Sequence, residues 1–129
     1  MKVLVEISVG ELFDKITILN IKIKKIGDQQ KLKNILKELN TLNEQATKID
    51  IPDKLLLDEQ VKKLQSINEE LWDIENFKRE CEANKDFGEN FIKLSRDVHF
   101  KNDIRAEIKK EINLLSNSII VEEKEYSKY

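Results

Sequence analysis

The sequence has few of the residues that interrupt regular structure. Only three glycines and one proline occur in 129 residues. Because these two residue types make most turns and helix stops, their scarcity predicts long helices with few connections. With 37% charged and 40% hydrophobic residues, the composition is typical of amphipathic helices in an all-α protein. A chain of this length forms one core, so we predict a single helical domain over residues 1–129.

Cysteine and histidine are equally scarce. The single cysteine, Cys81, has no internal disulfide partner, and one cysteine with one histidine cannot build a zinc-type cluster. We therefore assign no metal site. The single histidine, His99, stands beside Phe100 and is interpreted as a surface or capping group rather than a catalytic residue.

The sequence also lacks long apolar runs and an excess of one charge. No run approaches the roughly 18 apolar residues of a membrane span. The apolar start MKVLVEI is interrupted by Glu6 and lacks a cleavage-like region, which favours a cytoplasmic location. The net charge of −2 argues against a general nucleic-acid binder, which normally carries a basic excess.

The clearest helix start lies at Ser8. Ser8 and Glu11 have the spacing of a capping box, which predicts a helix over residues 9–26. Apolar residues recur along this helix at intervals of four and three, at Leu12, Ile16, Leu19, Ile23 and Ile26. Its polar residues therefore lie beside a buried stripe: Glu11, Asp14, Lys15, Thr17 and Lys22.

The same periodicity predicts four further helices, over residues 30–49, 55–84, 89–101 and 103–116. The last boundary rests on Asn102 and Asp103, which make a good N-cap pair. We expect a bundle of about five helices, in which the second and third form a long antiparallel hairpin with a coiled-coil seam. Short β-type runs at 3–5 and 119–121 predict a minor two-stranded pairing of the chain ends.

Polar residues interrupt the apolar seam of the third predicted helix. Asn68, Trp72, Glu75 and Arg79 are spaced by four, three and four residues, so they form one stripe beside the seam. One interpretation is structural: the helix rotates out of the bundle, and Glu75 and Arg79 form an ordinary ion pair. The other is a pocket wall, with Trp72 as a stacking platform and Arg79 as an anion anchor.

A second polar stripe flanks the last predicted helix, at Asn102, Arg105, Lys109 and Asn113. A solvated helix face is the plain interpretation, since basic residues often flank an apolar stripe. If the polar stripes instead face each other, a carboxylate drawn out of water needs a nearby cation. We then expect Arg105 or Lys109 within ion-pair reach of Glu11, Asp14 or Glu75.

Several strings resemble a family of short bacterial and phage proteins of unknown function: VEISVGELFDKITILNIK, INEELWDIE, FIKLSRDVHFKNDIRAEIKKEIN and SIIVEEKEY. The family patterns are V-E-x-S-V-G-E-L-x-D-K-x-T-I-L near the N-terminus and N-D-x-R-A-x-I-K near the C-terminus. The resemblance covers most of the chain and falls on the polar stripes. It implies an association with glycosyltransferases of surface-polysaccharide synthesis, and it implies no particular activity.

Two classes of function remain open, and neither establishes whether the protein is an enzyme. In the first, the protein is an interaction or accessory module that forms a homodimer or docks to another protein. The dimer is suggested by the width of apolar surface along the seam of the second predicted helix, because Leu36, and Leu56 at the start of the third, lie off that seam. No catalytic residue and no cofactor is assigned.

In the second class, the polar stripes converge on a small anion such as a nucleotide-sugar or a sugar phosphate, or form a metal-dependent hydrolase. Glu11 and Asp14 supply one E-x-x-D pair for magnesium, but the E-x-x-E partner of Glu75 is missing because position 78 is lysine. The candidate residues for a polar cluster or binding site are Glu11, Asp14, Lys15, Lys22, Asn68, Trp72, Glu75, Arg79, Asn102, Asp103, Arg105 and Lys109.

Overall fold

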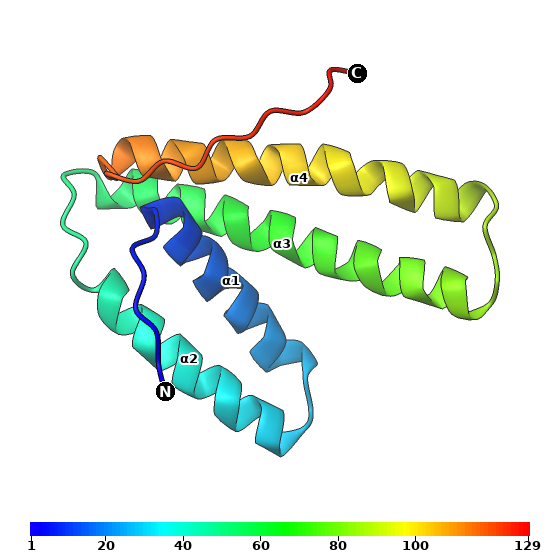
Figure 1. Cartoon of the computed structure of the whole chain (residues 1–129), viewed down its shortest axis with the longest axis horizontal. Helices are drawn as coiled ribbons and strands as arrows, with labels where there is room; N and C mark the ends of the chain where they lie inside the picture. The colour runs from blue at the N-terminus through cyan, green and yellow to red at the C-terminus, as the bar shows by residue number, and fades with distance from the viewer.

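The computed structural model describes all residues 1–129 and is all-α, as predicted. Its four helices are α1 (Val9–Lys25), α2 (Gln29–Ala46), α3 (Lys54–Ala83) and α4 (Glu89–Leu115). They form two hairpins, α1 with α2 and α3 with α4, and α1 also packs against both helices of the longer pair (Figure 1). None of the helices combines the length and the apolar character that crossing a membrane requires.

Three of the four helices begin at a side-chain cap. The hydroxyl of Ser8 accepts a hydrogen bond from the amide of Glu11 at 3.1 Å. Asp28 caps α2 and Asp53 caps α3 in the same way, each accepting at 2.9 Å. Because these caps are local, the predicted starts at 9, 30 and 55 agree with the structure within one residue. The predicted start at 89 also agrees, although α4 has no side-chain cap.

The predicted boundary at Asn102 and Asp103 is wrong, because α4 continues through both residues. Lys101 pairs with Glu70 of α3 at 2.8 Å, and Arg105 pairs with α1, so the turn that contains the expected break is held on both sides. Asparagine and aspartate inside a helix cost only a few tenths of a kcal/mol more than good helix formers. Ile104, which follows the expected break, points outward from the bundle and is 43% exposed.

The predicted pairing of the second and third helices is wrong as well. Among the helices, α2 contacts only α1, and the long antiparallel hairpin is α3 with α4 (Figure 1). The seam of α2 contributes Ile35 and Leu39 to a cluster with three apolar residues of α1: Leu12, Ile16 and Leu19. Heptad spacing shows that a helix has a partner, but the spacing does not say which helix it is.

The expected two-stranded pairing of the chain ends does not form, and the structure contains no strand. The two ends do start from the same corner, where the amide of Val9 donates to the hydroxyl of Ser118 at 3.1 Å. From there they diverge. The first residues run toward α2, and the last residues run back along α4 (Figure 1).

Candidate functional site

Asp14 on α1 is the centre of the polar site and is only 2% exposed. Its Oδ1 accepts from Nε of Arg105 at 3.0 Å and from Nδ2 of Asn68 at 2.9 Å. Its Oδ2 accepts from Nη2 of Arg105 at 2.5 Å. The guanidinium therefore binds the carboxylate at two points, the strongest geometry for this pair. One carboxylate thus joins α1, α3 and α4.

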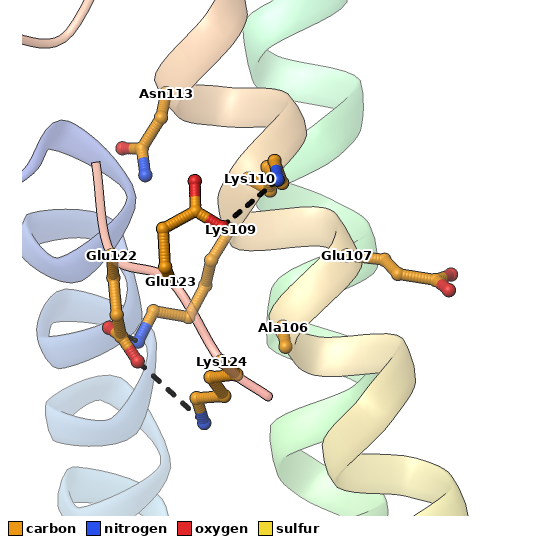
Figure 2. A pocket seen from close by; sticks show the side chains of 8 residues that line it. All are labelled: Ala106, Glu107, Lys109, Lys110, Asn113, Glu122, Glu123 and Lys124. Carbon is orange, nitrogen blue, oxygen red and sulfur yellow. Dashed lines mark hydrogen bonds and ion pairs between the residues drawn. The ribbon is translucent and has the colours of Figure 1, made fainter. Parts of the chain in front are cut away.

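Lys109 on α4 extends the site to the C-terminal segment. Its side chain is 8% exposed and donates to Glu11 at 2.7 Å and to Glu122 at 3.0 Å. Figure 2 shows the amine of Lys109 reaching the carboxylate of Glu122, which also pairs with Lys124 at 3.7 Å. The C-terminal segment is therefore tied to the same cation as α1.

A small pocket of about 140 Å³ lies between α4 and this segment (Figure 2). Its walls carry charges of both signs, and Lys110 pairs with Glu123 across it at 3.3 Å. The pocket therefore already contains matched charges.

The charges of the site reinforce one another. Burial alone would raise the pKa of Asp14, but the hydrogen bonds from Arg105 and Asn68 lower it below its ordinary value of 3.8. Burial alone would lower the pKa of Lys109, but its bonds to Glu11 and Glu122 raise it above 10.5. The hydrogen bond to Asp14 raises the pKa of Arg105. All three groups are therefore ionised at neutral pH.

The polar network is closed. It joins two cations, Arg105 and Lys109, to three carboxylates, Glu11, Asp14 and Glu122. Every buried side-chain nitrogen or oxygen in the molecule has a hydrogen-bond partner. A network whose cations are already matched has no spare positive charge for an anion.

The prediction that Arg105 or Lys109 lies within ion-pair reach of Glu11, Asp14 or Glu75 is confirmed for Glu11 and Asp14. Two other predicted residues join the edge of the network. Lys15 pairs with Glu11 at 3.7 Å, and Asn102 accepts from Nη1 of Arg105 at 3.4 Å.

Two predicted residues lie apart from the network. Asp103 accepts a hydrogen bond from the hydroxyl of Tyr129, whose ring also packs on His99 and Phe100. Lys22 lies half-buried near the end of α1. The structure thus separates these two side chains from the carboxylates with which the sequence grouped them.

The remaining predicted residues line an open groove of about 390 Å³ between α1, α3 and α4. Trp72 is half-buried on its wall, and Glu75 and Arg79 are exposed. Ile18, Ile21 and Leu71 supply its apolar surface. Asn68 and Arg105 line the groove as well as the network, so the two features share a wall.

Three residues of the site were not singled out from the sequence: Gly10, Ser118 and Glu122. The amide of Gly10 donates to Oδ1 of Asn113 at 2.7 Å, and a Cβ on Gly10 would lie 2.5 Å from the carbonyl oxygen of Lys109. Glu122 and Ser118 come from the segment after α4. The available signal was a glycine in the first turn of a helix, in a chain with only three glycines.

No group of three or more histidine, cysteine, aspartate or glutamate side chains is arranged to hold a metal ion. The E-x-x-D carboxylates of Glu11 and Asp14 are bound by Lys109 and Arg105 instead.

The fold and site define a small all-α protein whose helices are joined by a buried ionic network. A family model described as "Family of unknown function (DUF6165)" matches residues 1–129, and the chain belongs to this family. No curated protein and no solved structure matches the chain.

Proposed function

We propose that the protein is an interaction module that binds another protein chain through residues 1–7, here called the N-terminal arm. The observation that supports this function is the exposure of the arm. Its apolar side chains are 36% to 121% exposed: Met1, Val3, Leu4, Val5 and Ile7. Contiguous apolar surface of this kind is rare on monomers and marks interaction sites.

The main chain of the arm is also free. None of the 88 backbone hydrogen bonds of the molecule involves residues 1–7. An extended segment with unpaired amides and carbonyls can add a strand to a partner, whose pockets then select the alternating side chains. The arm therefore has both the hydrogen-bonding groups and the apolar side chains of a β-type interaction.

Hydrogen bonds around the first turn of α1 support this function by fixing the root of the arm. Ser8, where the arm ends, is 3% exposed and caps α1. The next two amides, of Val9 and Gly10, donate to Ser118 and Asn113. A fixed root reduces the ordering cost of binding, because only the arm itself must be immobilised.

Photo-crosslinking from the arm tests this function. A photoreactive phenylalanine analogue in place of Leu4 should give protein adducts in the producing cells. The matched control is the same analogue in place of Phe87, which is 51% exposed in the loop that joins α3 to α4. Adducts from Phe87 only, or from neither position, would overturn the proposal. The family resemblance makes a glycosyltransferase of surface-polysaccharide synthesis the first unlike partner to seek among the adducts.

A second candidate function is supported by the groove. Trp72 offers an aromatic surface, and Arg79, which lies outside the network, offers a cationic group on the same groove. This combination suits a small ligand with an anionic group and a flat or apolar part, such as a nucleotide-sugar.

Trp72 is the only tryptophan, so its fluorescence reports directly on the groove. Titration with nucleotide-sugars should quench this fluorescence, and Arg79→Gln should weaken the quenching. Lys78→Gln, one position away and outside the groove, is the control. A signal that is flat in every titration would eliminate the second candidate function.

A further inference from the structure

We infer that the partner of the N-terminal arm is a second copy of this chain, and that two arms pair antiparallel across a two-fold axis. This inference rests on the proposed function and names its partner. The register places Leu4 opposite its counterpart in the second copy. Such a pairing is isologous, because the same segment is used by both copies.

The charges of the arm select this register. Around Leu4, Lys2 of one copy lies opposite Glu6 of the other, and this happens twice by symmetry. Opposite charges that face each other across paired strands stabilise the pair, and like charges destabilise it. The arm carries only these two charged side chains, so both are matched.

The alternation of side chains supports the same register. Successive residues of a strand point to opposite faces. In this pairing Val3 faces Val5, and Met1 faces Ile7, so one face of the ribbon is entirely apolar. Lys2, Leu4 and Glu6 form the other face, with the ion pairs at its edges. The pattern of the arm is therefore self-complementary on both faces.

Other registers lose this match. Moving the axis by one residue in either direction sets Lys2 against Ser8 or against Leu4, and leaves Glu6 opposite Leu4 or without a partner. Parallel pairing in register would bring Lys2 to Lys2 and Glu6 to Glu6. Register is specified most strongly where one slip changes every contact.

Helix α2 offers a weaker surface for self-association. The seam of α2, which first suggested a dimer, is covered by α1 through Ile35 and Leu39. Leu36 remains 47% exposed, but it is a single side chain. The arm is the longer contiguous apolar surface, and its main chain is unpaired along its whole length.

A charge-swap series tests the pairing. Sedimentation velocity over a range of concentrations should show a reversible dimer of the unmodified chain. Lys2→Glu or Glu6→Lys alone turns two attractions into two repulsions, and should weaken the dimer roughly tenfold or more. The double variant Lys2→Glu/Glu6→Lys restores opposite charges and should restore dimerisation. A chain that is monomeric at every concentration, or a double variant no better than the singles, would overturn the inference.

Engineered disulfides test the register directly. In a Cys81→Ala background, Leu4→Cys should form a disulfide with itself, because directly opposed strand residues have Cα separations of about 4.5 to 5.5 Å, within disulfide range. Lys2→Cys and Glu6→Cys should each crosslink poorly alone and efficiently when mixed. Equal crosslinking of all combinations would show that the two arms do not pair in one fixed register, and would overturn this part of the inference.

These results separate this inference from the function on which it rests. Adducts from Leu4 that contain two copies of this chain support both. Adducts to an unlike protein from a chain that is monomeric would retain the interaction function and overturn the self-pairing. A dimer that persists after deletion of residues 1–6 would place the self-association elsewhere.

Discussion

The ion pair between Asp14 and Arg105 is stable because its geometry offsets a large loss of hydration. Taking a carboxylate out of water costs several kcal/mol, and attraction to one cation seldom compensates without further hydrogen bonds. Asp14 accepts two hydrogen bonds from Arg105 and one from Asn68, and Lys109 lies 3.7 Å away. Removing any one donor should therefore cost more than the removal of a surface charge.

Replacing Arg105 with leucine should lower the free energy of unfolding by about 2 to 4 kcal/mol, because Asp14 would keep a buried charge without its main partner. Urea denaturation measures this change. Arg79→Leu is the matched control, since that arginine is exposed on the groove and its loss should change stability by less than about 0.5 kcal/mol. Equal effects of the two substitutions would contradict a structural role for the network.

The pKa of Asp14 sets the direction of the response to acid. Because the folded pKa lies below 3.8, the unfolded chain binds more protons as the pH falls through that value. Asp14 therefore contributes stability that is complete above about pH 5, and this stability is lost as the pH falls through the lowered folded pKa. Unfolding curves between pH 2 and 6 should show a weaker pH dependence for Asp14→Asn than for the unmodified chain. If the stability of the two proteins depended on pH in the same way, the pKa of Asp14 would not be lowered by folding.

At this scale the sequence predicted the side chains that belong to a periodic pattern. Asn68 interrupts an apolar seam, and Arg105 and Lys109 repeat along one flank of their helix, so their spacing marked them for a polar contact. Glu122 lies in a segment without periodicity, and the close approach at Gly10 depends on where another helix crosses. Neither property is visible in local spacing.

At the scale of the elements, the close packing of α1 against α4 requires glycine at position 10, because glycine has no side chain. Alanine normally stabilises a helix by up to about 1 kcal/mol over glycine. At position 10, however, a Cβ would meet the carbonyl oxygen of Lys109 at 2.5 Å, which no ordinary contact allows. Gly10→Ala should therefore lower stability by about 1 to 3 kcal/mol through overpacking. Thermal and urea unfolding should show no such loss for Gly27→Ala, where nothing lies within 4 Å.

Helix α2 packs against only one other helix, α1. We therefore expect α2 to unfold locally while the rest of the molecule stays folded. It buries only Ile35 and Leu39, whereas α3 buries eight residues. Segments with few buried contacts open at a lower free energy than the whole molecule. Native-state hydrogen exchange should show amides near Leu39 exchanging at least about tenfold faster than amides near Leu64. Uniform protection across both helices would indicate a fully cooperative unit.

Helix starts were predictable because caps are local, whereas helix partners were not. A single apolar period in fact continues through the false break in α4, at Leu94, Val98, Lys101, Arg105, Ile108 and Ile112. The two charged members of that series hid its continuity, since their partners lie on α3 and α1. Helix α2 packs against α1 because the short connection between them turns the chain back. The spacing of apolar residues does not predict the direction of such a connection.

At the scale of the whole molecule, the network joins parts of the chain that are distant in sequence. Arg105 and Asp14 are 91 residues apart, and Val9 and Ser118 are 109 apart. The α1–α2 and α3–α4 contacts instead join neighbours in the chain. Contacts of long range form late, because the ends of a long loop must first be brought together.

This separation has a consequence for synthesis on the ribosome. Asp14 emerges early, and α1 and α2 can pair while the rest of the chain is still being translated. The cations that match Asp14 lie in α4, and Arg105 follows Asp14 by 91 residues. The nascent chain therefore carries Asp14 without its cationic partners until α4 has left the exit tunnel.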